Sequence, residues 1–305
     1  MTVTDRAFLG SDDLESISRL VGDAWLADRP HVPFTITTLE WLMANQPAET
    51  PWSDRIRLWE DQNGLAAVAW YWPPGSADGL VRADLEAGQL WDEIYAWQAD
   101  VAATAEGGPV VLSRFAIDGP TPERLRLLRH GFSPTDEALS QWHQVLDGPP
   151  LEPVLPPGYR LRTLAGPDEV EARVAVHRAA FAPSHLTVER YERVMASPHY
   201  SIDRDVVVEA PDGTLAAFAI AWFDGSAAVG ELEPVGTHPD YRRLGLALAA
   251  NRFALRILQE AGARDAIVFS QADNAASEAL YAAGGFHRLA THRRWERSPA
   301  PTIAT

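Results

Sequence analysis

The chain has 305 residues, enough for about two domains, and its composition is that of a globular protein: 46% hydrophobic and 22% charged residues. It lacks an apolar run of about 18 residues and a basic, apolar leader at the N-terminus, so we expect no membrane span, no signal peptide and a cytoplasmic location. Cysteine is absent, and the nine histidines show no metal-ligand spacing, which makes disulfides, thiolate nucleophiles and metal chemistry unexpected.

The formal net charge of −16 is concentrated in the first half of the chain. Residues 1–150 carry 10 arginines against 23 acidic residues, whereas residues 151–305 carry 16 against 19. Lysine is absent, which excludes Schiff-base catalysis. An acidic surface repels nucleic acid and anionic membranes and favours cationic small molecules, or it serves solubility alone.

An internal repeat accounts for the length of the chain. Three pairs of segments match in the same order at offsets of 156, 150 and 154 residues. They are residues 6–15 with 162–171, residues 65–69 with 215–219, and Gly131-Phe132 with Gly285-Phe286. We therefore predict two copies of one unit, residues 1–150 and 151–305, joined by a stiff linker at 147–158 that contains five prolines.

The first copy is rich in tryptophan and acidic at the start of one helix. It holds nine of the eleven tryptophans, most of which we expect to pack in the core or between domains. Its third strand is followed by residues 84–93, where four carboxylates would repel a pyrophosphate. Leu127 aligns with Tyr281 of the second copy. We predict that the first copy has lost a cofactor site and keeps at most a role in shaping the substrate cleft.

The second copy is predicted to alternate strands and helices. Strands are expected at 159–164, 205–210, 214–223, 228–237 and 265–271 with a final pair ending near Trp295, and helices at 168–181, 187–197, 243–261 and 274–283. The period of two places Glu231, Glu233, Val235 and Thr237 on one face of strand 228–237. Pro234 suits a strand that splays from its neighbour and leaves backbone groups free.

The segment from Val235 to Leu248 reads as a strand end, a tight turn and a helix start. The first amides of a helix lack intrahelical partners and carry partial positive charge, so they attract phosphate. Gly245 and Ala247 let an oxygen approach the backbone closely. We predict that a pyrophosphate binds here. The candidate residues are Val235, Gly236, Thr237, Arg242, Arg243, Leu244, Gly245, Leu246, Ala247 and Leu248.

Two motifs in this order resemble the GNAT superfamily of N-acetyltransferases. Arg242-x-x-Gly245-x-Ala247 is similar to the family's Q/R-x-x-G-x-G/A signature, and Asn274, Ser277, Tyr281 and Gly285-Phe286 are similar to a second family segment. The resemblance implies two tandem α/β (α+β) domains, each a mixed, mostly antiparallel sheet flanked by helices, in an arrangement similar to that of mycothiol synthases. It also implies that the loop amides bind the pyrophosphate of acetyl-CoA and that the free strand edge pairs with the pantetheine arm.

Acetyl transfer to an amine needs a base and a proton donor for the departing thiolate. Either Glu233 or Glu231 can be the base, although a strand carboxylate can also face solvent or pair with arginine. By resemblance Tyr281 is the acid. Asn274, Ser277 and Tyr281 share one helix face and are candidate cofactor contacts, and Asn274 is alternatively a helix cap.

We therefore predict an acetyl-CoA-dependent N-acetyltransferase acting on a primary amine of a small, cationic acceptor, without a metal, nucleic acid or membrane partner. The alternative is a non-catalytic protein that binds or senses acetyl-CoA or another small ligand. The sequence identifies neither the acceptor nor the oligomeric state.

Overall fold

The computed structural model describes residues 2–28, 34–85 and 89–299, and the chain divides into two compact units. Glu86, one of the four carboxylates predicted to repel a pyrophosphate, lies outside the described residues. Unit 1 comprises residues 1–33, 49–140 and 290–305, and unit 2 comprises residues 34–48 and 141–289. Each unit thus contains a segment from the other half of the sequence. The domain boundary at residue 150 stays a prediction.

Unit 1 is a six-stranded sheet with helices. Its strand order is β1-β2-β3-β4-β5-β12, antiparallel except for a parallel contact of β4 with β5. The strands are β1 (Thr4–Ala7), β2 (Ile56–Asp61), β3 (Gly64–Trp72), β4 (Ser76–Val81), β5 (Leu112–Ile117) and part of β12 (His287–Arg297). The helices are α1 (Ser11–Asp28), α3 (Trp52–Arg55), the short η1 (Ala83–Leu85), α4 (Leu90–Glu106) and α5 (Pro122–Arg129).

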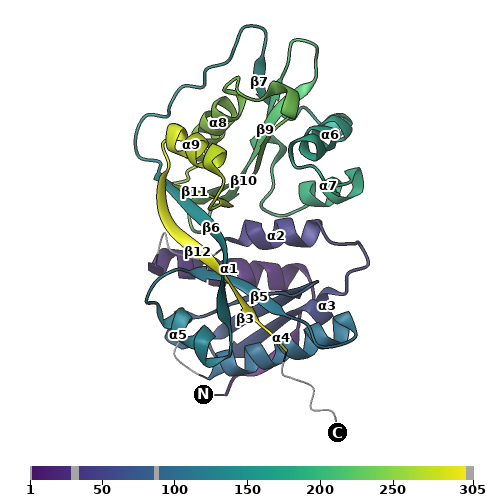
Figure 1. The fold of residues 1–305 in the computed structure, drawn as a ribbon, viewed down its shortest axis with the longest axis vertical. Coiled ribbons are helices and arrows are strands. Elements are labelled where there is room, and N and C mark those ends of the chain that lie inside the picture. The colour runs from purple at the N-terminus through teal and green to yellow at the C-terminus, as the bar shows by residue number, and fades with distance from the viewer. Residues whose placement is uncertain (1, 29–33, 86–88, 300–305) are drawn as a thin grey trace. The chain divides into compact units, whose positions relative to one another are not determined.

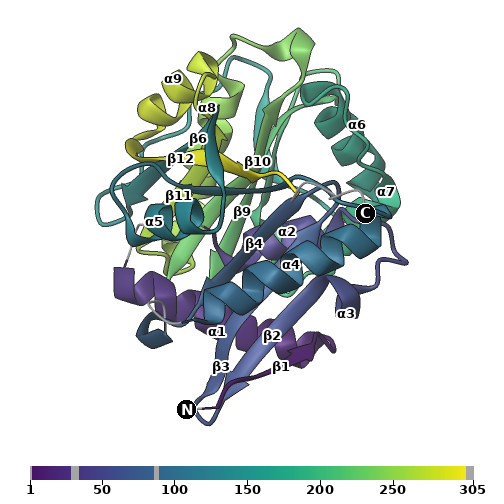
Figure 2. The same ribbon diagram turned by 60° about the horizontal axis from the view of Figure 1, so that its bottom comes forward.

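The core of unit 1 follows from the alternation of side chains along β3. Ala67, Ala69 and Tyr71 pack in one cluster with residues of α4, which lies over β3 and β4 (Figure 2). Trp70 and Trp72 of the same strand are also buried, so an aromatic side chain points to each face. Six of the nine tryptophans of the first half are buried, as the packing prediction requires: Trp25, Trp59, Trp70, Trp72, Trp91 and Trp142.

Unit 2 has the sheet order β6-β11-β10-β9-β8-β7. The strands are β6 (Ser133–Val145, of which 141–145 belong here), β7 (Arg160–Thr163), β8 (Asp205–Glu209), β9 (Leu215–Asp224), β10 (Val229–Thr237) and β11 (Asp265–Gln271). The helices are α2 (Ile36–Ala44), α6 (Val170–Ala180), α7 (Val188–Met195), α8 (Leu246–Glu260) and α9 (Ala275–Gly284), with the short η2 (Pro167–Glu169), η3 (Ile202–Arg204) and η4 (Pro239–Tyr241). The helices and the first five strands predicted for this half are present, with ends shifted by a few residues. The predicted final pair of strands is wrong, because one continuous strand, β12, follows α9.

Strand β9 separates two cores in unit 2. Its alanines at 217, 219 and 221 pack with α8 and α9, and the small side chains let α8 approach the sheet closely. Phe218, Ile220 and Trp222 point to the opposite face and pack with α6 and α7. Figure 1 shows the two helix pairs on opposite sides of β9 and β10. Helix α2, from the first half of the chain, packs on the α7 side.

The repeat is visible in side-chain interactions as well as in the sequence. In unit 1, Arg6 donates to Asp13 and Glu60, and Asp13 accepts from the Leu9 amide. In unit 2, Arg162 makes the matching bonds to Glu169 and Glu209, and Glu169 accepts from the Ala165 amide. Both networks tie the first strand of a copy to its following helix and to a neighbouring strand.

The last strand of each half takes part in the sheet of the other unit. β12 pairs antiparallel with β5 in unit 1, from Ile117 opposite His292 to Leu112 opposite Arg297. In unit 2 the end of β6 lies beside β11, where Trp142 donates to Ser270 and His143 bonds to Asp265. The linker after β6 is also held within unit 2, since Gln259 of α8 donates to the carbonyls of Leu146 and Gly148.

Candidate active site

The predicted phosphate loop forms a tight turn at the start of α8. η4 is followed by Arg243 with φ 68° and Gly245 with φ 77°, and Gly245 is the N-cap of α8. Left-handed backbone is strained for a non-glycine residue, and such strain is often found at functional sites. A Cβ on Gly245 would meet no atom within 4 Å. Glycine is therefore favoured here by the left-handed backbone conformation and not by a lack of space.

The amides at the start of α8 are open to a ligand. The N-cap makes no side-chain hydrogen bond, which leaves the N–H groups of Leu246, Ala247 and Leu248 without a capping acceptor. The side chains of Arg242 and Arg243 are exposed on the same turn. A hollow of about 350 Å³ adjoins the turn and is lined by Leu244, Gly245, Leu248, Ala249 and Arg252 together with linker residues 154–156. The turn can therefore accept an anionic group next to an apolar surface.

Strands β10 and β11 separate in front of this turn, as Pro234 predicts. The parallel pairing runs from Val229 opposite Asp265 to Glu231 opposite Ile267, whereas β10 continues to Thr237 and β11 to Gln271. The pairing of β10 with β9 is also irregular between Leu232 and Val235. Val235, Gly236 and Thr237 are half-buried on the far side of this irregularity. Gly236 has no room for a side chain, because a Cβ would lie 2.5 Å from the ring of Phe218.

Glu231 is a buried carboxylate with hydroxyl partners. It accepts hydrogen bonds from Thr35 and from Thr37, the latter at 2.6 Å, while Thr38 lies at 3.4 Å. Burial raises the pKa of Glu231, and the three threonine hydroxyls oppose that rise. The alternative of an arginine-paired or solvent-facing strand carboxylate does not describe Glu231.

Glu233, two residues along the strand, lies in a different setting. Burial and the negative charge of Glu231 raise the pKa of Glu233 to about 8. Its backbone carbonyl accepts from the indole of Trp222. A carboxylate with a pKa near neutrality suits proton transfer from an amine.

Tyr281 faces the same region from α9. It is 5% exposed and packs against Trp142 and Phe286. Burial, and secondarily the charge of Glu233, raise the pKa of the Tyr281 phenol, which keeps it protonated at neutral pH. The charge of Glu231 thus acts on Glu233, and the charge of Glu233 acts on Tyr281.

Asn274 is the N-cap of α9, where its side chain accepts from the amide of Ser277 at 3.2 Å. The alternative role considered for Asn274 from the sequence, a helix cap, is therefore present. Contact of Asn274 and Ser277 with a cofactor stays a prediction.

Threonines 35, 37 and 38 are site residues that sequence reasoning missed. They lie in the first half of the chain, in a segment that belongs to unit 2. The run Thr35-Ile36-Thr37-Thr38 at the start of α2 was a local signal for a helix N-terminus, but nothing in it pointed to Glu231.

Part of the chain matches a known protein family. The Acetyltransferase (GNAT) family matches residues 174–286, a range that includes β10, the loop, α8, β11 and α9. The second half of the chain thus carries a GNAT-family domain. The predictions of this family and of its tandem arrangement are confirmed.

Similar sequences come from proteins named mycothiol acetyltransferase. That of Saccharomonospora viridis is 27% identical over 55% of this chain and 63% of its own length, and that of Geodermatophilus obscurus is 29% identical over 56% and 58%. The chain thus matches about three fifths of the length of these relatives. That of Cellulomonas flavigena is 26% identical over 90% of this chain and 88% of its own length.

Solved GNAT structures share the fold across the whole chain. An N-acetyltransferase of Sphaerobacter thermophilus has a TM-score of 0.70 at 19% identity and covers 99% of this chain and 98% of its own. A tandem GNAT protein from the clavulanic acid biosynthesis pathway has a TM-score of 0.69 at 16% identity, covering 99% and 100%. The predicted fold class, tandem domains with mostly antiparallel sheets flanked by helices, is confirmed.

Unit 1 has different residues at the place that corresponds to Glu233 of unit 2. Trp72 of unit 1 and Trp222 of unit 2 are equivalent in the repeat, so the residues that pair with them are equivalent too. Trp72 pairs with Ser76, and Trp222 pairs with Glu231. Asp78, two residues after Ser76, is therefore the counterpart of Glu233. Asp78 forms an ion pair with buried Arg114 at 3.0 Å, and Arg114 also contacts Glu123 at 2.9 Å.

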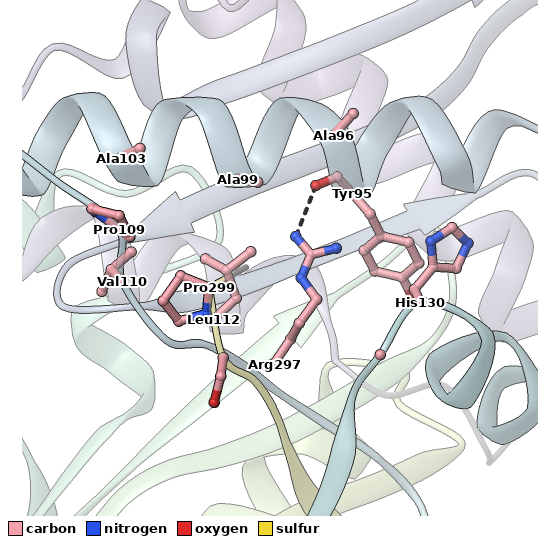
Figure 3. A pocket seen from close by; sticks show the side chains of 12 residues that line it. Tyr95, Ala96, Ala99, Ala103, Pro109, Val110, Leu112, His130, Arg297 and Pro299 are labelled. Carbon is pink, nitrogen blue, oxygen red and sulfur yellow. Dashed lines mark hydrogen bonds between the residues drawn. The ribbon is translucent and has the colours of Figure 1, made fainter. Parts of the chain in front are cut away.

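A hollow of about 590 Å³ lies elsewhere in unit 1 (Figure 3). Alanines of α4 line it, and Arg297 of β12 donates to the backbone carbonyl of Tyr95 at 3.1 Å. Asp78 is not among the lining residues, so this hollow is separate from the place that corresponds to Glu233.

Two features are absent from residues 2–28, 34–85 and 89–299. No helix there is long and apolar enough to cross a membrane. No group of three or more metal-binding side chains is found within the same described ranges.

Proposed function

We propose that this GNAT protein transfers the acetyl group of acetyl-CoA to a primary amine of a small acceptor. The observation that supports this most strongly is the placement of Glu233 and Glu231 where β10 separates from β11, with Tyr281 coupled to Glu233. The base is Glu233, because Glu231 is occupied by hydroxyl groups whereas Glu233 has the pKa of about 8 that suits an amine.

The residues at the loop fit the cosubstrate. The open amides of residues 246–248 and the exposed Arg242 and Arg243 suit a pyrophosphate. The free edge of β10 beyond Glu231 offers N–H and C=O groups for the amide-containing pantetheine arm. The thioester then lies toward Glu233.

In the reaction, Glu233 accepts a proton from the acceptor's ammonium group, directly or through water, and the neutral amine attacks the thioester carbonyl. The new C–N bond forms as the C–S bond breaks. Tyr281 gives its proton to the departing sulfur, so the products are an amide and CoA with a free thiol. The excess amine proton restores the phenol through solvent.

The acceptor is a cationic amine of low molecular mass. The net charge of −16 and the acidic pair at the site favour a positively charged molecule. The name of the relatives, mycothiol acetyltransferase, makes the acceptor of those enzymes the first candidate to assay.

Calorimetric titration with acetyl-CoA, followed by a free-thiol assay with a panel of amines, tests the proposal. We expect one binding site per chain and amine-dependent release of CoA. The double variant Arg242→Glu with Gly245→Glu should lose binding, whereas Arg19→Glu with Ala105→Glu, two exposed helix positions in unit 1 with the same charge change, should keep it.

The outcomes separate the competing interpretations. Two sites per chain would contradict the loss of cofactor binding in the first copy. Binding without turnover on any amine would favour the sensing alternative, and no binding would refute the acetyltransferase proposal.

A further inference from the structure

The segment 34–48 is part of unit 2 although it lies in the first half of the chain. It contains α2, which packs on α7 and β9. The segment is anchored by several polar contacts: Arg193 of α7 donates to the carbonyls of Ala44 and Gln46, and Glu40 accepts from the backbone and ring of His199. These contacts hold the middle and the C-terminal end of α2 against unit 2.

The start of α2 meets the buried end of β10. Thr35, the N-cap of α2, and Thr37 in its first turn both donate their hydroxyls to the same Oε2 atom of Glu231. The two hydroxyls also lie 2.6 Å from each other. Thr35 is 3% exposed, Thr37 2% and Glu231 5%, so water does not replace these bonds.

Two neighbouring carboxylates in one buried site cannot both be ionised without a large cost. Hydrogen-bond donors and the positive end of a helix favour the charge on the carboxylate that they face. Glu231 has both, whereas the influences on the Glu233 carboxyl are burial and the charge of Glu231. The arrangement therefore places the first negative charge on Glu231. Glu233 gives up its own proton as the pH rises through about 8, and this yields the carboxylate form that accepts a proton from the amine.

We propose that Thr35 and Thr37 are positioning residues of the acetyl-transfer site, whose hydroxyls hold Glu231 as the fixed anion beside Glu233. The N-terminal half of the chain thus supplies part of the site that the C-terminal half carries. This inference rests on the proposed function, in which Glu233 is the base.

The direction of the expected change follows from the charges around Glu233. Two titratable groups act on it in the described part of the chain, Glu231 on the same strand and Tyr281 on α9. Loss of the two hydroxyls makes the Glu231 anion less favourable, so Glu231 binds a proton more readily. The repulsion that raises the pKa of Glu233 then weakens, and that pKa falls.

The test uses the full chain with Thr35→Val and Thr37→Val, separately and together. We expect the acid limb of the pH profile of kcat/KM to move down by about one pH unit in the double variant. Glu231→Gln should move it in the same direction, because it removes the charge directly. Thr35→Ser with Thr37→Ser keeps both hydroxyls, so its acid limb should lie at the same pH as that of wild type. Thr104→Val on α4 is the matched control and should also leave the limb in place.

A merely structural role would lower the melting temperature and kcat and leave the acid limb in place, and that result would overturn the proposal. If the double valine variant fails to fold, Glu231→Gln and the single variants carry the same comparison.

A second readout does not depend on turnover. The carboxyl carbon of Glu233, assigned with Glu233→Gln, can be titrated by NMR in protein carrying 13C-labelled glutamate. A downward shift in the valine variants supports the positioning role even if no amine is acetylated, in which case the proposed function fails separately. An unchanged titration refutes the positioning role whatever the activity.

Discussion

The two units of this protein share a scaffold and differ in the residues at the place where we propose the acetyl-transfer site of unit 2. Arg6 in unit 1 and Arg162 in unit 2 make the same bonds to the helix that follows and to a neighbouring strand. At the equivalent place on the central strands, unit 1 has Asp78 and unit 2 has Glu233.

The surroundings of the two carboxylates differ more than the carboxylates themselves. Arg114 occupies the space beside Asp78 and reaches Glu123, so the charges compensate one another, and the pKa of Asp78 rises only to about 6 because burial outweighs Arg114. Leu127, fully buried, aligns with Tyr281. In unit 1, structural ion pairs thus occupy the place at which we propose proton transfer in unit 2.

The loops that follow these two strands differ as well. In unit 2 the loop ends in left-handed Gly245 with open helix amides. In unit 1 Arg82 leads into η1 and is paired with Asp61 and Asp84. A cation committed to carboxylates is not available to a phosphate, which agrees with the predicted loss of cofactor binding in the first copy.

The largest expected effect comes from Glu233→Gln, which removes the proposed base and keeps the shape of the side chain. We expect kcat/KM to fall by about 100-fold to 10,000-fold with unchanged affinity for acetyl-CoA. Steady-state kinetics and calorimetry measure the two quantities. The matched variant Asp78→Asn in unit 1 should leave kcat/KM within about twofold, and an equal loss in both variants would contradict the division of roles.

Arg114→Met should destabilise unit 1, because it leaves buried Asp78 without its cation and leaves Glu123 with Arg126 at 3.9 Å. Breaking a buried ion pair costs about 3–5 kcal/mol, which urea unfolding followed by tryptophan fluorescence detects. Acetyl-CoA should still bind with one site per folded chain. A changed stoichiometry would mean that unit 1 takes part in cofactor binding.

Tyr281→Phe should lower kcat by about 10-fold to 100-fold, since the departing thiolate loses its proton donor. Its control is Tyr71→Phe, which removes a phenol from unit 1 that donates to Glu106. Equal kinetics for wild type and Tyr281→Phe would refute the acid role of Tyr281 and leave its packing role.

The smallest expected effect is a pH dependence of stability. The pKa of Glu233 in the folded protein is raised to about 8, so the folded state binds this proton more tightly than the unfolded chain does. Its contribution is fully present below the ordinary glutamate pKa and is lost as the pH rises through about 8. The melting temperature of wild type should therefore fall by about 2–4 °C more than that of Glu233→Gln between pH 6 and pH 9. Parallel curves for the two proteins would contradict the raised pKa.

The sequence by itself determined the repeat, the order of the elements in the second half and the loop at α8. These features have local signals: hydrophobic period, a glycine that takes left-handed backbone, and a proline that ends regular pairing at Glu231. Asn274 also had a local signal, and both of its possible roles were visible in the sequence.

Only the tertiary structure decided what surrounds the two glutamates. Thr35 and Glu231 are 196 residues apart, Arg114 reaches Asp78 from another strand, and β12 pairs with β5 of the other half. Sequence periodicity reports which face of an element is buried, because burial recurs every turn or every second residue. It carries no information on which distant segment covers that face, since that choice depends on the packing of the whole unit.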